Sequence, residues 1–91
     1  MSKAIRLFES KEHKGRSDAA AFLRQLAEKI ENGDVKLRSG SEDIQLKIPD
    51  KVVLEVEVEE KEKNVKGKEH SLEIEIKWYD KDISKGSIEI E

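Results

Sequence analysis

The sequence predicts an α+β domain in two layers, with one amphipathic helix packed on one face of a mostly antiparallel sheet. Residues 17–32 place apolar side chains at helical spacing. After Gly33 the pattern changes to alternating apolar and polar residues, the period of strands with one solvated face. The connectors are short, so strands that are neighbours in sequence should be neighbours in the sheet. The predicted order is β-α-β-β-β-β, with a short extra C-terminal strand left open.

The helix at 17–32 is the most strongly marked element. Ser17 is expected to cap it, since a serine hydroxyl can accept a hydrogen bond from a free backbone amide one turn later. Gly33 is expected to end it, because glycine adopts the left-handed conformation without strain. Its apolar side is formed by Ala19, Phe22, Leu23, Leu26, Ala27 and Ile30.

The predicted strands cover residues 4–10, 35–38, 44–48, 52–59 and 72–78. The first is ambiguous in its facing, because Leu7 and Phe8 are adjacent and cannot both point into a core. Residues 60–70 are mostly charged and are expected to form a connector. Ile88 and Ile90 mark the short extra strand that the prediction leaves open.

Length and composition favour one small cytoplasmic domain spanning 1–91, in which 1–3 and about 80–91 are flexible or add an edge strand. Cysteine is absent, which excludes disulfides and thiolate chemistry and favours a reducing compartment. Neither a signal peptide nor an apolar run of membrane-spanning length is present, so no membrane partner is expected. Lysine and glutamate far outnumber arginine and aspartate, a thermophile-like composition.

The order of these features resembles the Amphi-Trp domain family. The resemblance covers about residues 5–79 and rests on the helix 17–30, Gly33, Val35-Lys36-Leu37, Ile48-Pro49, the Val-Glu repeat of 52–59 and the 72–78 run that ends in Trp78. The family is named for an amphipathic strand that ends in tryptophan. It consists of short prokaryotic proteins without an established biochemical activity, so the resemblance implies a fold and no mechanism. The chain departs from the family pattern by continuing past Trp78.

Residues that could carry chemistry are sparse. His13 and His70 lie in charged connectors, without the positioned partner that a general base needs. The glycines form no phosphate-binding motif, and the serines lie in turns or caps. The sequence therefore predicts no catalytic residue, no metal site and no cofactor. An enzyme would require a pocket with perturbed carboxylates, which a sequence cannot reveal.

An acidic row is the first candidate interaction surface. Glu55, Glu57 and Glu59 share one face of a strand, and Glu73 and Glu75 share one face of the next. Antiparallel pairing would join them into one patch, either a solvated outer face or a docking surface for a basic partner. Trp78 follows in phase with Leu72, Ile74 and Ile76, which favours the core but leaves open a partly exposed interface anchor.

A lysine-rich connector is the second candidate. Lys61, Lys63, Lys66 and Lys68 are candidate phosphate contacts, although neighbouring glutamates nearly cancel their charge. Aromatic residues are only 4% of the chain and the isoelectric point is near 5.5, which disfavours a nucleic-acid partner without excluding one. The sequence thus predicts a non-enzymatic protein-binding or self-associating module, with a protein partner or a homodimer. The alternative is an accessory RNA- or ribosome-associated protein that uses the lysine-rich loops.

Overall fold

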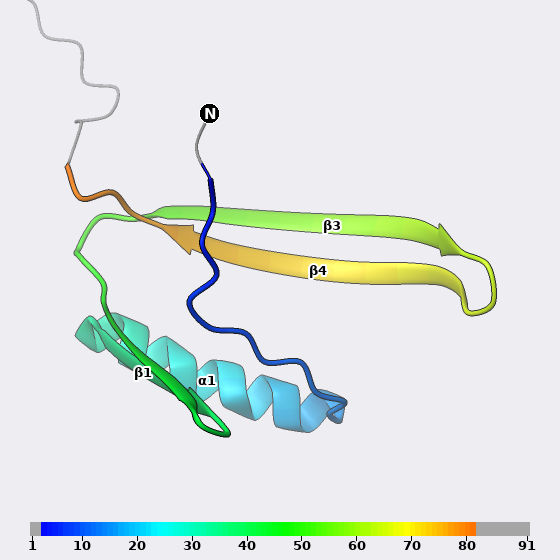
Figure 1. Cartoon of the computed structure of the whole chain (residues 1–91), viewed down its shortest axis with the longest axis horizontal. Helices are drawn as coiled ribbons and strands as arrows, with labels where there is room; N and C mark the ends of the chain where they lie inside the picture. The colour runs from blue at the N-terminus through cyan, green and yellow to red at the C-terminus, as the bar shows by residue number, and fades with distance from the viewer. Residues whose placement is uncertain (1–2, 82–91) are drawn as a thin grey trace, which may run out of the picture. The chain divides into compact units, whose positions relative to one another are not determined.

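The computed structural model describes residues 3–81, in which one helix precedes four antiparallel strands (Figure 1). This order confirms the α+β class. The chain divides into two compact units, Met1–Asp50, here called the helical unit, and Lys51–Glu91, here called the hairpin unit. Each unit contains one two-stranded sheet, where the sequence predicted a single larger sheet. That the chain acts as a single domain stays a prediction.

Helix α1 spans Arg16–Asn32, close to the predicted 17–32. Its N-cap is Gly15, whose extended backbone lets its carbonyl accept the Ala19 N–H at 3.0 Å. The prediction that Ser17 caps the helix is therefore wrong, since Ser17 already lies within the first turn. The predicted end of the helix is confirmed. Gly33 is left-handed, with φ 83°, and its N–H donates to the Ile30 carbonyl at 2.9 Å.

Strands β1 (Asp34–Ser39) and β2 (Glu42–Lys47) complete the helical unit as a tight antiparallel hairpin. Its two-residue loop begins with Gly40, whose positive φ suits such a connection. Val35 lies opposite Leu46 and, at 2% exposure, is the one fully buried hydrophobic side chain among residues 3–81. Because α1 contacts β1, the small core of this unit is centred on Val35.

Strands β3 (Val53–Lys63) and β4 (Gly67–Lys77) form the long antiparallel hairpin of the second unit (Figure 1). The prediction of a charged connector over 60–70 is wrong, because both strands continue through it and leave only 64–66 as the turn. The register supplies the physical reason. Glu62 lies opposite Lys68 and Lys61 opposite Glu69, and opposite charges facing each other across strands stabilise pairing.

Two further predictions concern the ends of the chain. Residues 3–15 contain neither helix nor strand, so the predicted strand at 4–10 is wrong. Ile5 and Leu7 are exposed and only Phe8 is half-buried, as expected when adjacent apolar residues define no single strand face. The strand suggested at 88–90 lies outside the described residues.

Candidate interaction surface

One face of the β3–β4 hairpin is aliphatic along half its length. Directly paired residues of an antiparallel ladder share a face, and the register pairs Leu54 with Ile76, Val56 with Ile74 and Val58 with Leu72. These three alternate rungs, six side chains in all, are called the apolar face below. Alternation with period two produces this face directly from the sequence.

Within the described part of the hairpin unit, nothing covers the apolar face. Exposure of its side chains ranges from 56% at Ile74 to 74% at Val58, while Ile76 is half-buried. Soluble proteins rarely expose a contiguous apolar patch of more than a few hundred Å², and larger patches mark interaction sites. The sequence predicts that the helix packs on one face of the sheet. Alternation shows that a strand has an apolar face but not what covers it.

The opposite side of the hairpin is acidic. Glu55 lies opposite Glu75 and Glu57 opposite Glu73, and Glu59 follows on the same face. The register therefore brings together the five glutamates that the sequence singled out, here called the acidic face. All five are exposed. Their role as a docking surface stays a prediction.

Lys77 partly neutralises the acidic face. Its ammonium group forms an ion pair with Glu55 and lies 4.0 Å from the Glu75 carboxylate. The hydrogen bond from Lys77, with its positive charge, holds the pKa of Glu55 below the ordinary 4.5. The same hydrogen bond and the carboxylate charges raise the pKa of Lys77 above the ordinary 10.5. Glu57 and Glu73 have no such cation within ion-pair distance in the described structure.

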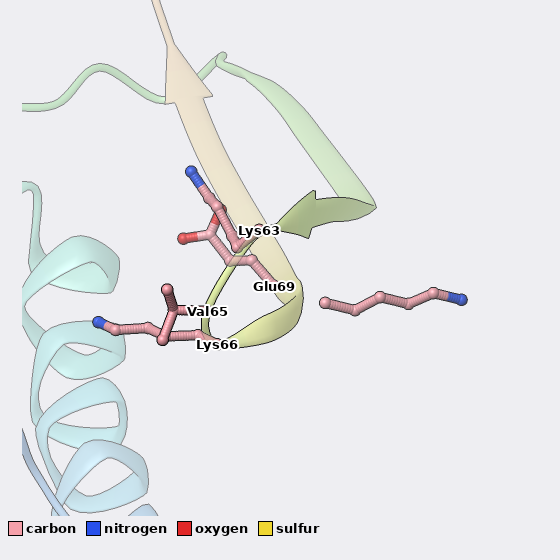
Figure 2. A pocket seen from close by; sticks show the side chains of 5 residues that line it. Lys63, Val65, Lys66 and Glu69 are labelled. Atoms are coloured by element: carbon pink, nitrogen blue, oxygen red, sulfur yellow. The ribbon is translucent and has the colours of Figure 1, made fainter.

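The candidate phosphate-binding lysines lie at the tip of the hairpin, and the register separates them. Lys61 and Lys63 belong to the acidic side, Lys68 to the other side, and Lys66 to the turn. Figure 2 shows Lys63 beside Glu69, whose carboxylate is 3.9 Å from its ammonium group, while Lys66 extends away from them. Lys68 lies 3.8 Å from a carboxylate oxygen of Glu60. The four lysines share residues 60–70 with Glu60, Glu62 and Glu69 (+4 and −3), so the tip carries a net charge of only +1 for binding a phosphate group.

Trp78 follows β4 directly and is half-buried. It lines an open hollow at the base of the hairpin together with Ile76, Lys77 and Tyr79. The strand ends one residue before the tryptophan, so Trp78 stands at its edge rather than within its pairing. An amphipathic strand that leads into a single tryptophan is therefore present in the structure.

Comparison with known families agrees with this arrangement. The model of the Amphi-Trp domain matches residues 1–91. The chain belongs to the Amphi-Trp domain family. No curated protein and no solved structure matches this Amphi-Trp chain.

Among residues 3–81 of the Amphi-Trp chain, the remaining polar groups form no assembled centre. His70 lies 3.4 Å from Glu60 at the hairpin tip, and His13 lies in the segment before α1. Within residues 3–81, no three histidine or acidic side chains gather closely enough to hold a metal ion. None of the helices described is long and apolar enough to cross a membrane.

The Lys77 ion pairs predict how stability of the Amphi-Trp hairpin changes with pH. A carboxyl whose folded pKa is depressed stabilises the fold above its unfolded pKa, and this stability is lost as pH falls through the folded pKa. Replacing Lys77 with methionine should therefore reduce the drop in thermal midpoint below pH 4.5. Because the folded pKa of Lys77 is raised, K77M should also remove a stability loss that begins above pH 10.5. Circular dichroism melts across pH, with K66M in the turn as control, measure both effects; identical pH profiles for K77M and the unmodified chain would contradict the assignment.

The acidic face predicts a stabilising substitution. Glu57 and Glu73 lie directly opposite each other, and like charges at such positions destabilise strand pairing. E73K should stabilise the hairpin by about 0.5 kcal/mol, raising the thermal midpoint by a few degrees. The control is E62K on the same hairpin, which replaces a favourable partner of Lys68 and should lower the midpoint. A shift in the same direction for both variants would refute the electrostatic explanation.

Proposed function

We propose that this Amphi-Trp protein is a non-enzymatic protein-binding or self-associating module whose contact surface is the apolar face of the β3–β4 hairpin. The observation that carries the proposal is the exposure of three alternate aliphatic rungs on one side of a long hairpin. The lack of cysteine in the chain supports a cytoplasmic setting for this function.

The energetics of a bare hairpin support the proposal. A two-stranded hairpin is at best marginally stable alone in water and gains independent stability when its apolar face packs against something else. Covering about 600 Å² of exposed aliphatic surface is worth about 15 kcal/mol in gross hydrophobic free energy. Association costs on the order of 4–15 kcal/mol. The face alone therefore supports only modest affinity, and the charged residues beside it decide which partner binds.

Site-specific photo-cross-linking tests the proposal in extract of the source cells. A photo-reactive amino acid replaces Val58 on the apolar face or, as matched control, Glu57, its neighbour on the acidic face. The proposal predicts intermolecular adducts from position 58 and far fewer from position 57. Mass spectrometry of the adduct then identifies the partner. If position 58 gives no intermolecular adduct, the apolar face is not a binding surface and the proposed function is wrong.

A further inference from the structure

We propose that the occupant of the apolar face is the same face of a second copy of this chain, packed so that β3 lies over the partner's β4. This inference rests on the proposed function and adds the identity of the partner. It is carried by the charged rungs that continue the apolar face toward the hairpin tip. There Glu60 pairs with His70 and Glu62 with Lys68 across the strands.

The two strands carry charges of opposite sign at the tip. On this side of the hairpin the tip of β3 is acidic, whereas the tip of β4 carries Lys68 and His70. A two-fold axis parallel to the strands would place β3 of one copy over β4 of the other, with both tips at the same end. Glu62 would then face the partner's Lys68, and Lys68 the partner's Glu62. Two copies are therefore complementary in charge through this face.

The middle of the other side of the hairpin does not offer this complementarity. There Glu55 lies opposite Glu75 and Glu57 opposite Glu73, and the lysines of this side lie toward the two ends, Lys77 at the base and Lys61 and Lys63 at the tip. Two acidic faces brought together would repel each other. Self-association is thus directed to the apolar face, and the acidic face remains outside.

The available area fits a dimer of modest affinity. Six aliphatic side chains at the exposures given above offer on the order of 600 Å² per copy, near the upper end for the largest patch of a monomer. Two copies would bury roughly 1,200 Å², the lower limit for specific and stable interfaces. Sheets that pack face to face lie about 10 Å apart, which leaves room for both sets of side chains. We therefore expect a concentration-dependent dimer.

The test uses a charge swap that preserves the hairpin itself. In the double variant E62K/K68E the directly opposite pair is reversed but intact, while the exposed Lys68–Glu60 ion pair is lost. An exposed ion pair contributes at most about 1 kcal/mol, so each hairpin should still fold. The variant should form its own dimer, as the unmodified chain does. Light scattering after gel filtration should give both samples twice the 10.4 kDa chain mass at high concentration. Mixed dimers would place like charges opposite each other at the tip.

After isotope-labelled unmodified chain is mixed with E62K/K68E, native mass spectrometry measures the mixed dimer. The proposal predicts a share below about a quarter, against the half expected for random exchange. The acidic-face variant E57K, mixed in the same way, should reach one half. Random exchange for E62K/K68E would overturn the proposed packing. A monomer at every concentration would overturn the dimer, yet the proposed function would stand if position 58 cross-linked to a different protein.

Discussion

Replacing Val35 with alanine is expected to destabilise the protein by about 2 kcal/mol. Val35 is 2% exposed and belongs to β1, the strand that pairs with β2 and contacts the helix, so the substitution removes two buried methyl groups and leaves a cavity. Urea unfolding followed by far-UV circular dichroism measures the loss as a lower midpoint at unchanged slope.

Val65 provides a matched control of the same residue type. It lies in the turn between β3 and β4 and is 95% exposed. Surface substitutions of this kind usually change stability by no more than ~0.5 kcal/mol. Equal effects of V35A and V65A would show that Val35 is not the centre of a packed core.

Replacing Gly33 with alanine is expected to cost about 2 kcal/mol. Gly33 adopts φ 83°, where an L side chain is strained, and a β-carbon there would lie 3.2 Å from the Ile48 carbonyl oxygen. The same residue ends α1 and accepts a 2.9 Å hydrogen bond from the Ile48 N–H. Strain at this point therefore affects both the helix end and the adjoining hairpin.

A substitution at Gly40 distinguishes backbone strain from contact with the Ile48 carbonyl as causes of the stability loss in G33A. It also has a positive φ, 61°, but a β-carbon there would meet no atom within 4 Å. G40A should therefore lose about 1 kcal/mol from backbone strain alone. Denaturant unfolding of both variants measures the difference. A loss in G40A equal to that in G33A would mean that contact with the Ile48 carbonyl contributes nothing.

The parts of the fold that could be predicted are those determined by the spacing of apolar and polar residues along a short stretch of sequence. Helical spacing placed α1 within one residue, and Gly33 identified its end because few residues tolerate a left-handed backbone. The two-residue period likewise predicted the alternating strands. It also predicted which glutamates would share a face, since antiparallel pairing fixes both facing and neighbours.

The other features depend on pairing and coverage, which are not local. In the sequence, residues 60–70 resemble a charged loop. In the structure, the register places Lys61 opposite Glu69 and Glu62 opposite Lys68, so the same residues form strands. The N-cap is Gly15 rather than the predicted Ser17, because a backbone carbonyl can begin a helix without a capping side chain. Most importantly, alternation cannot distinguish an apolar strand face that is covered from one that is exposed. For that reason the sequence directed attention to the acidic face rather than the apolar one.

The central claim is that the apolar face of the hairpin is covered by another molecule. Because the chain has no cysteine, a single V58C substitution reports on that face through its rate of reaction with a maleimide, and V65C in the exposed turn is the control. The claim predicts that V58C reacts more slowly than V65C in concentrated protein or source-cell extract, and that the difference disappears on dilution in buffer. Equal rates under all conditions, or protection of V58C that persists on dilution, would contradict it.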